Sequence, residues 1–278
     1  MLSALLVPLG WSINNSFAKK ALEELKTISF LFYRYLIALP ILILIFFAFD
    51  SLMIPELNVL FLIVISSFLA FVSKYTICEA FKNEKISVAA PIIDSYPVIT
   101  VSLAVIFLGE TIFLNHILGF VLILISVYMI SQEKLEIKMP SFSKGILFSI
   151  AALFFQGISY AILKIVVERL TPLNASLYIE LSVFLFVLVS VLVFEKMKPS
   201  KIKKSGIPLI IAGFSMVIPS VFYMIAIKEI GVALTSIIAS STPVFNSIVA
   251  FVVLKEKLPN WKYLAILLLV LGLVVLIV

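Results

Sequence analysis

One apolar stretch, repeated once, constrains the fold of this chain more than any other feature. Residues 86–110 read ISVAAPIIDSYPVITVSLAVIFLGE and are long enough to cross a bilayer. The pattern returns 146 residues later, at 232–256, where Pro243 matches Pro97. Such a repeat indicates a chain built from two copies of one unit.

The composition identifies the class of protein. Hydrophobic residues make up 63% of the 278 residues and charged residues 13%, a balance far from that of a soluble domain. We therefore expect an integral membrane protein with little chain outside the bilayer. The single cysteine, Cys78, excludes an internal disulfide and a cysteine-cluster metal site, and the single histidine, His116, argues against a histidine-rich centre. No metal or cofactor is expected.

Ten apolar segments of about 18–24 residues follow one another along the chain, and each matches the thickness of a hydrocarbon core. They are expected at Leu2–Ala18, Ile28–Phe49, Val59–Cys78, Ile86–Leu108, Phe113–Ile130, Ile146–Val167, Leu173–Phe194, Ile207–Ile227, Val232–Leu254 and Tyr263–Val278. The connectors are short and charged, and none is long enough for a soluble domain. The sequence therefore predicts an all-α integral membrane protein with ten transmembrane helices.

The chain divides near its middle into two predicted five-helix repeats, residues 1–133 and 143–278. Matches at nearly the same offset extend outside the central spans, since Tyr178 follows Tyr33 by 145 residues. Because five is an odd number, the second copy must enter the membrane in the opposite sense. Inverted repeats are typical of secondary transporters, which bind substrate near the repeat interface. The alternative is a gene duplication in a protein of another function.

Asp94 is an ionisable residue deep within the fourth predicted span, between Pro91 and Pro97. Its distance from the start of the helix places it roughly 12 Å below the membrane face. A charge at that depth costs at least about 2.5 kcal/mol, so it usually faces protein or a water-filled cavity. Each proline removes a backbone donor and is expected to kink its helix, as is Pro243 in the second copy.

Lys74 and Asp94 are expected at similar depth below the same face, on a hairpin formed by the third and fourth spans. Mutual neutralisation in an ion pair is one interpretation, and a direct role in binding a substrate or proton is the other. Arg34 is near enough to the end of its helix to extend its head group to the membrane surface, so we interpret it as mostly architectural.

Glu180, in the seventh predicted span, has no obvious cationic partner in the neighbouring spans, although Lys164 is a candidate. A lone buried carboxylate tends to be neutral. Two interpretations stay open. Either Glu180 carries a proton during transport, or it is a protonated residue that forms hydrogen bonds within a helix interface.

Smaller polar and aromatic side chains form a second group of candidates. Ser240 lies on a serine-bearing face of the ninth span, and Asn14 belongs to a polar patch in the first. Such faces can line a cavity, but small residues also favour tight helix packing in membranes. Tyr75, Tyr96 and Tyr223 are candidates to stack on a solute or to form hydrogen bonds with it, and the alternative is that they are packing or interfacial residues.

Three segments resemble a known transporter family. Residues 89–130, AAPIIDSYPVITVSLAVIFLGETIFLNHILGFVLILISVYMI, combine a proline-bearing helix, a Gly-Glu end and a glycine-led final span. Residues 241–277, STPVFNSIVAFVVLKEKLPNWKYLAILLLVLGLVVLI, keep the proline and Glu256 but have Lys255 in place of the glycine. Residues 32–44, FYRYLIALPILIL, are similar to the Arg-aromatic opening of the family's second span. Together these segments resemble the EamA-type transporters of the drug/metabolite transporter superfamily over essentially the whole chain.

The resemblance implies a central cavity shaped largely by the third, fourth, eighth and ninth spans. The first, second, sixth and seventh spans would then act as gates. Asp94 and Glu180 lie outside the family motif, so we interpret them as particular to this protein or its subfamily.

Two classes of function fit such a chain. The first is a secondary transporter that moves a small organic metabolite, for instance an amino acid, by alternating exposure of a midplane cavity. The second is an intramembrane enzyme acting on a lipid-linked substrate. Because the sequence has no HExxH motif, Gly-x-Ser-x-Gly elbow or Walker A motif, we predict a non-enzymatic transporter. Its candidate binding or coupling residues are Asp94, Lys74, Glu180, Asn14, Tyr75, Tyr96, Tyr223 and Ser240.

The predicted partners are the small-molecule substrate and membrane lipids. The net charge is +6, but the lysines lie in short connectors, where they set topology and contact phospholipid rather than nucleic acid. We expect a monomer in the cell membrane, with a dimer as the alternative. Most connector lysines follow odd-numbered spans, so the positive-inside rule places both termini outside the cytoplasm, whereas the family resemblance implies the reverse.

Overall fold

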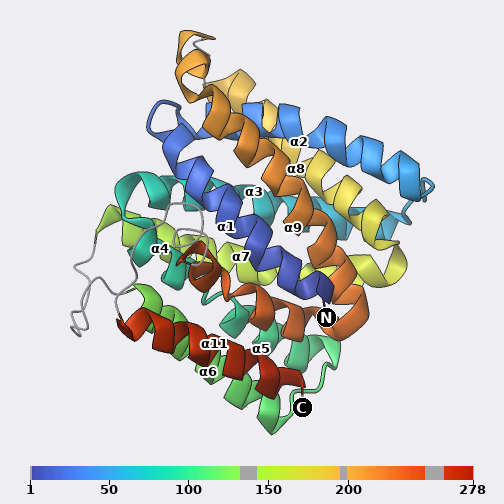
Figure 1. The fold of residues 1–278 in the computed structure, drawn as a ribbon. Helices are drawn as coiled ribbons and strands as arrows, with labels where there is room; N and C mark the ends of the chain where they lie inside the picture. Colours follow the sequence, from blue (N-terminus) through green and yellow to red (C-terminus); the bar gives the residue numbers. More distant parts are fainter. Residues whose placement is uncertain (1, 132–142, 195–198, 248–259, 278) are drawn as a thin grey trace.

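The computed structural model describes residues 2–131, 143–194, 199–247 and 260–277, and the regular structure in these ranges is helical throughout (Figure 1). The helices are α1 (Leu2–Leu22), α2 (Thr27–Phe49), α3 (Leu57–Asn83), α4 (Ile86–Ile93), α5 (Pro97–Leu108), α6 (Leu114–Ser131), α7 (Lys144–Arg169), α8 (Pro172–Phe194), α9 (Pro199–Ala239) and α11 (Asn260–Ile277). A further helical stretch covers residues 242–247. The predicted all-α fold is confirmed.

Six of the described helical segments are long and apolar enough to cross a membrane. They are Thr27–Phe49, Leu57–Asn83, Ile86–Leu108, Lys144–Arg169, Pro172–Phe194 and Ser205–Ala239. Two shorter apolar helices, Leu114–Ile130 and Trp261–Leu276, accompany them. The count of ten spans stays a prediction, because the end of the predicted ninth span, residues 248–254, lies outside the described residues.

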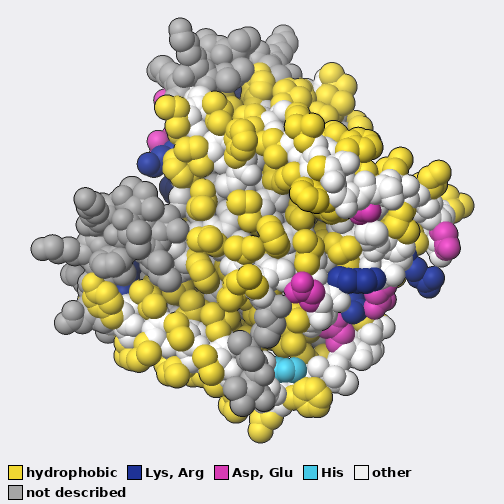
Figure 2. All heavy atoms as spheres, turned by 45° about the vertical axis from the view of Figure 1, so that its right-hand side comes forward, with side chains coloured by type: hydrophobic (Ala, Val, Ile, Leu, Met, Phe, Trp, Pro, Cys, Tyr) yellow, Lys and Arg dark blue, Asp and Glu magenta, His cyan; other side chains and the backbone are white. Residues whose placement is uncertain are grey.

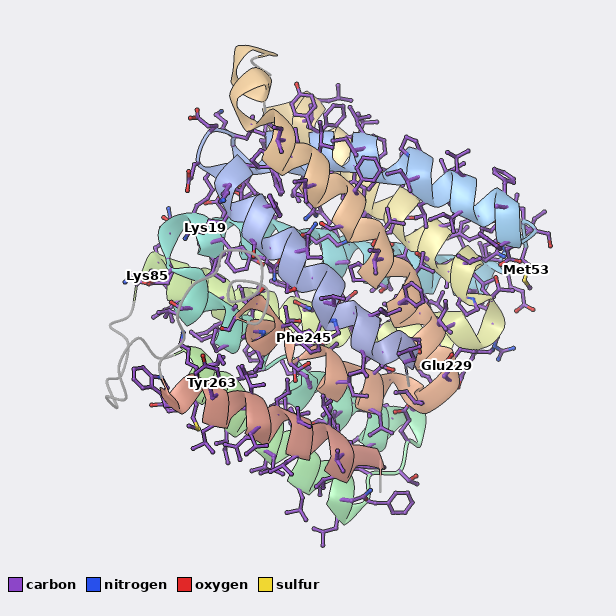
Figure 3. The ribbon with its side chains drawn as sticks, viewed as in Figure 1. Lys19, Met53, Lys85, Glu229, Phe245 and Tyr263 are labelled. Atoms are coloured by element: carbon purple, nitrogen blue, oxygen red, sulfur yellow. The ribbon has the colours of Figure 1, made fainter. Side chains whose placement is uncertain are left out.

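The outer surface of the helix bundle is apolar. Phe47, Phe107 and Leu192 expose 70%, 73% and 77% of their surface, which suits lipid tails rather than water. Figure 2 shows hydrophobic side chains covering most of one face, with charged side chains gathered towards two opposite edges. In Figure 3, Lys19 and Lys85 lie towards one end of the bundle. These features indicate two polar ends separated by a hydrophobic belt.

The two halves of the chain interlock. The most extensive helix contacts are those of α1 with α9, α3 with α7, and α6 with α11, and each pair joins one half to the other (Figure 1). Glycine permits the closest of these approaches: a Cβ atom on Gly10 would lie 2.6 Å from Pro219, and one on Gly119 would lie 2.8 Å from the carbonyl oxygen of Gly272. Neither half therefore has a separate core.

The fourth predicted span is broken rather than kinked. The helix α4 ends at Ile93, and α5 begins at Pro97, which occupies the first turn of the new helix, where its missing amide hydrogen costs least. Asp94 is the residue that ends α4. Pro91 lies inside α4 without ending it, so the break belongs to Pro97 rather than to both prolines.

The second copy has the same break. The helix α9 ends at Ala239, and the chain becomes helical again at residue 242, one residue before Pro243. At each break, a serine amide donates to the carbonyl oxygen three residues earlier, at 3.3 Å for Ser95 and 3.2 Å for Ser241. The repeat seen in the sequence thus extends to the local hydrogen bonding of the backbone.

The helix α9 spans the predicted connector between the eighth and ninth spans. Its axis is interrupted at Gly231, whose φ of 81° is a left-handed conformation that glycine adopts without steric cost. The carboxylate of Glu110 accepts hydrogen bonds from the backbone amides of Val232 and Ala233, both at 2.9 Å. Glu110 therefore caps a new helix start within α9.

Candidate functional site

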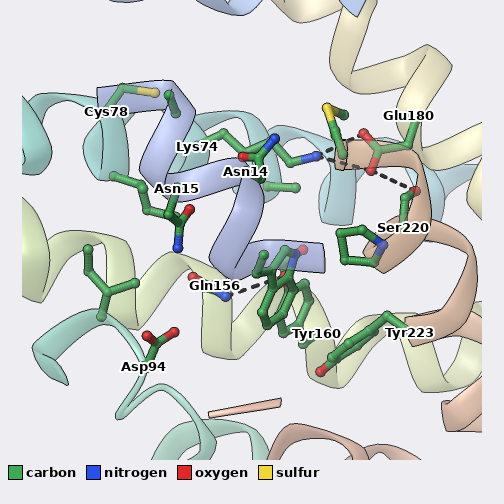
Figure 4. A pocket seen from close by; sticks show the side chains of 18 of the residues that line it. Asn14, Asn15, Lys74, Cys78, Asp94, Gln156, Tyr160, Glu180, Ser220 and Tyr223 are labelled. Atoms are coloured by element: carbon green, nitrogen blue, oxygen red, sulfur yellow. Dashed lines mark hydrogen bonds and ion pairs between the residues drawn. The ribbon is translucent and has the colours of Figure 1, made fainter. Parts of the chain in front are cut away.

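A cavity of about 120 Å³ lies between the two halves (Figure 4). Its lining residues come from α1, α2, α3 and α4 of the first half and from α7, α8 and α9 of the second. The family resemblance implied walls from the third, fourth, eighth and ninth spans. In the structure, the first, second, sixth and seventh spans (α1, α2, α7 and α8) contribute lining residues as well, and residues 232–247 of the ninth span contribute none.

A buried ion pair occupies one end of the cavity. The Nζ atom of Lys74 lies 2.8 Å from Oε2 and 3.1 Å from Oε1 of Glu180, and it also donates to the hydroxyl of Tyr35 at 2.8 Å. The same carboxylate accepts hydrogen bonds from Tyr35 at 2.5 Å and Ser220 at 3.0 Å. Four helices, α2, α3, α8 and α9, meet at this group, which ties the two halves together. Figure 4 shows the contacts of Glu180 with Lys74 and Ser220.

This arrangement corrects the sequence-based pairing. Lys74 pairs with Glu180, so the predicted pairing of Lys74 with Asp94 is wrong. Lys164 was the candidate partner of Glu180. It instead pairs with Glu110 at 3.5 Å and with Glu168, one turn further along α7, at 3.2 Å. The prediction failed because similar depth in the membrane does not determine which way two side chains face. The helix α3 packs on α8, from the other half, more extensively than on α4.

Asp94 lies apart from this ion pair. It lines the cavity and is 5% exposed, and in the described part of the chain its carboxylate has neither a hydrogen-bond partner nor a cation. Figure 4 shows it at the opposite side of the cavity from Lys74 and Glu180. Burying an unpaired carboxylate is costly, so a group that supplies a positive charge or a proton would stabilise this site.

Aromatic rings form one wall of the cavity. Trp11 stacks on Tyr160 with ring centroids 6.1 Å apart, and the rings of Tyr160 and Tyr223 are 4.5 Å apart. Tyr96 meets Tyr160 edge to face at 5.2 Å, behind the lining. Packed rings of this kind give a rigid apolar surface whose faces also attract cations.

Two buried polar side chains in the lining have unused hydrogen-bonding groups. Arg34 is 6% exposed, and neither its Nε nor its Nη2 atom has a partner in the described chain, while Nη1 makes a long contact of 3.5 Å with Oδ1 of Asn14. Gln156 donates to Tyr160 at 3.3 Å but leaves its carbonyl oxygen without a partner. The prediction that the Arg34 head group reaches the membrane surface is therefore wrong.

The structure brings together most of the predicted site residues. The cavity lining includes Asp94, Lys74, Glu180, Asn14 and Tyr223, whereas Tyr75, Tyr96 and Ser240 are not part of it. Ser240 is buried, and its hydroxyl donates to the carbonyl oxygen of Ile237 at 2.8 Å. The role of these residues in binding stays a prediction.

Sequence reasoning missed three contributors, which are Trp11, Tyr35 and Ser220. A signal existed for Ser220, because it occupies the repeat position of Lys74, 146 residues later. Both side chains contact the same carboxylate. Tyr35 carries no comparable signal at this offset, where its match is Leu181.

The described residues contain no group of three or more His, Cys, Asp or Glu side chains that could hold a metal ion. The site instead combines isolated charges, amide groups and aromatic rings within a helical bundle. These features define a multi-pass membrane protein with a cavity between its halves, lined by apolar surface and a few polar and charged side chains.

Comparison with known sequences places the chain in a family. The sequence model of the EamA-like transporter family matches residues 1–132 and again residues 143–278. The chain belongs to the EamA-like transporter family. This confirms the resemblance seen in the sequence, and it points to a membrane transporter rather than an enzyme.

Individual relatives and a solved structure are similar to this chain as well. An uncharacterized transporter of Archaeoglobus fulgidus is 25% identical over 195 residues, which cover 68% of this chain and 66% of that protein. An uncharacterized protein of Methanocaldococcus jannaschii is 26% identical over 127 residues, which cover 46% of this chain but 92% of that protein. A protein of known crystal structure superposes with a TM-score of 0.81 over 100% of this chain and 97% of that chain, at 15% identity, which supports the fold alone.

Proposed function

We propose that this protein is a secondary transporter that moves a small organic metabolite carrying an ammonium group, such as an amino acid, by alternating access. The observation that carries this proposal is Asp94, a buried carboxylate that faces the cavity and has no cation beside it among the described residues. An ammonium group would supply the missing charge. The unpaired carbonyl oxygen of Gln156 offers a second acceptor in the same lining.

The aromatic wall supports a cationic group in the same place. Trp11, Tyr160 and Tyr223 all line the cavity, and their faces attract an ammonium ion by cation–π interaction. Asp94 is also dispensable for the scaffold, because its repeat match at the second break is Ser240, which forms the same backbone turn without a charge. A charge retained at one of two equivalent positions favours a role in function over one in folding.

The volume of the cavity suggests the size of the substrate. The cavity measures about 120 Å³, slightly less than the roughly 150 Å³ that holds benzene in an engineered protein core. We therefore expect a solute of about six non-hydrogen atoms in this conformation.

Alternating access is supported by the position of the cavity. Helices of both halves line it, so rocking of one half against the other would open it to either side of the membrane. The paired helix breaks lie at matching positions in the two copies, as inverted repeats require. The first break, at Asp94, borders the cavity, and transporters commonly use the backbone groups of such breaks for binding.

Uptake into proteoliposomes without nucleotide tests this proposal. We expect saturable counterflow of a labelled small amino acid, such as glycine or alanine, or of a small amine. Asp94→Asn should lose most of this uptake and still melt near the wild-type temperature, because the amide has nearly the same shape and removes an unpaired buried charge.

Asp50→Asn is the matched control, since Asp50 is the other aspartate of the chain and lies at the end of α2, outside the cavity. It should transport like the wild type. Absence of uptake of every amine-bearing solute by folded wild-type protein would refute the proposal, and unchanged uptake by Asp94→Asn would refute the role given to that residue.

A further inference from the structure

We propose that Arg34 is a carboxylate-binding residue, so that the substrate is a zwitterion held between Arg34 and Asp94. The inference rests on the proposed transport function and specifies the second charged group of the solute. Sequence reasoning gave Arg34 an architectural role, whereas the structure places it in the cavity wall.

The unused atoms of Arg34 form one edge of its guanidinium group. Nε and Nη2 have parallel N–H bonds, and these two atoms have no hydrogen-bond partner in the described ranges. This edge matches the two oxygens of a carboxylate in a bidentate contact. Nη1, on the other side, faces Asn14. The arginine is thus oriented, and the edge best suited to a carboxylate is left unused.

The surroundings of Arg34 hold it in position without neutralising it. Its Cζ atom lies 5.3 Å from the ring centroid of Phe30 and 5.7 Å from that of Tyr35. Asn14 is itself fixed, because its amide nitrogen donates to the carbonyl oxygen of Ala212 at 2.5 Å. Aromatic and amide contacts orient a guanidinium but carry no formal negative charge, so the positive charge stays available.

The charges of the described lining leave one cation and one anion without a partner. Four charged side chains line the cavity, and Lys74 and Glu180 neutralise each other at 2.8 Å. Arg34 and Lys74 both lie against the ring of Tyr35, so the excess positive charge is at the ion-pair end of the cavity. Asp94 lies at the other side (Figure 4).

A zwitterion is the solute that complements this distribution. A simple amine would satisfy Asp94 and leave the Arg34 edge unpaired, whereas a simple acid would do the opposite. Buried donors and acceptors without partners cost free energy, so each incomplete solute should bind more weakly than one carrying both groups. A small zwitterion such as glycine or alanine fits the volume of the cavity.

The first test uses wild-type protein and requires no mutation. Proteoliposomes are assayed for counterflow with alanine, alaninamide and ethylamine, all of which carry the ammonium group, while alanine alone carries a carboxylate. We expect the KM for alanine to be at least about tenfold lower than that for either analogue, since each 1.4 kcal/mol corresponds to tenfold. Equal KM values for alanine and alaninamide would overturn the inference.

The second test changes the guanidinium. Arg34→Lys keeps the charge and removes the bidentate edge, so it should raise the KM for alanine about tenfold and leave the KM for ethylamine nearly unchanged. Arg169→Lys, at the exposed end of α7, is the matched control and should behave like the wild type. An equal loss for alanine and ethylamine would indicate a structural role for Arg34 and contradict the inference.

The outcomes separate the inference from the proposed function. If the wild type transports amines and zwitterions alike, the transporter proposal stands and the carboxylate site is refuted. If no amine-bearing solute is transported, the proposed function itself fails. If Arg34→Lys does not fold, the comparison of alanine with alaninamide in the wild type still decides.

Discussion

Glu180 accepts four hydrogen bonds from three side chains, and this density explains why its charge is tolerated inside the bundle. The side chains of Lys74 and Glu180 are only 24% and 9% exposed, so both ions have lost most of their hydration. Attraction in a low-dielectric interior repays that loss when the remaining hydrogen bonds are satisfied, as they are here. Removing one ion leaves the other buried without a counter-ion.

Glu180→Leu should therefore lower the free energy of unfolding by about 3 kcal/mol, because it strands the ammonium group of Lys74. The double change Lys74→Met with Glu180→Leu should restore most of that loss, since it replaces both ions with apolar groups of similar size. Thermal melting of detergent-purified protein is the measurement.

Glu168→Leu provides the comparison, because Glu168 pairs with Lys164 at 3.2 Å but is 55% exposed. Its melting temperature should stay close to that of the wild type. If the double variant melts as low as Glu180→Leu, then Glu180 stabilises the bundle through something other than its pairing with Lys74.

The helical segment that begins after Gly231 within α9 is capped by Glu110, a residue from the other half of the chain. Glu110 follows α5, yet its carboxylate caps the helical turn after Gly231 and lies 3.5 Å from Lys164 of α7. A carboxylate at a helix start satisfies two amide donors and interacts favourably with the helix dipole. One side chain thus connects the end of the first repeat to two helices of the second.

Glu110→Ala should destabilise the protein by about 1–2 kcal/mol, the range typical of losing a helix cap. The effect should be local, so hydrogen exchange of the amides in residues 232–239 should accelerate more than exchange in α2. The stability and the local exchange rate of Glu110→Gln should lie between those of the wild type and Glu110→Ala, because an amide has one acceptor oxygen for the two backbone donors.

Glu168→Ala serves again as the control, since it removes another acidic partner of Lys164 without touching a helix start. Its exchange over residues 232–239 should match the wild type. Equal acceleration in both variants would contradict the capping role of Glu110.

The whole molecule has two polar ends, and its orientation in the membrane is a testable consequence. Lys19 and Lys85 lie towards one end of the bundle, and Met53 and Glu229 lie towards the other (Figure 3). Lys19 and Lys85 belong to connectors that follow odd-numbered spans, and in the sequence such connectors hold most of the connector lysines. The positive-inside rule places that end in the cytoplasm, although the family resemblance implies the reverse.

Cysteine labelling decides between the two orientations. Ser51 and Asn83 are exposed and lie in or beside connectors that follow even- and odd-numbered spans, respectively. In a Cys78→Ala background, we expect an impermeant thiol reagent to label Ser51→Cys on intact cells and Asn83→Cys only after permeabilisation. The opposite pattern would show that the family arrangement holds.

The sequence alone was sufficient for the class, the helical fold and the repeat. These features depend on local properties of the chain. The hydropathy of a segment indicates whether it is buried in lipid, and helical hydrogen bonds join residues only four positions apart. Pro97 and Pro243 marked the places where the two equivalent helices are irregular. The sequence predicted kinks there, and only the structure showed that the helices are interrupted. Local information also identified Asp94 and Lys74 as residues needing partners or a cavity.

Only the tertiary structure decided which charges meet. Lys74 and Glu180 are 106 residues apart, and they pair because α3 packs on α8 across the two halves. The same packing places no cation of the described chain beside Asp94, and it places Arg34 in the cavity wall. No local pattern encodes these outcomes, because a charged side chain in a membrane protein is stabilised by whichever helix faces it, and that is determined by the packing of the whole bundle.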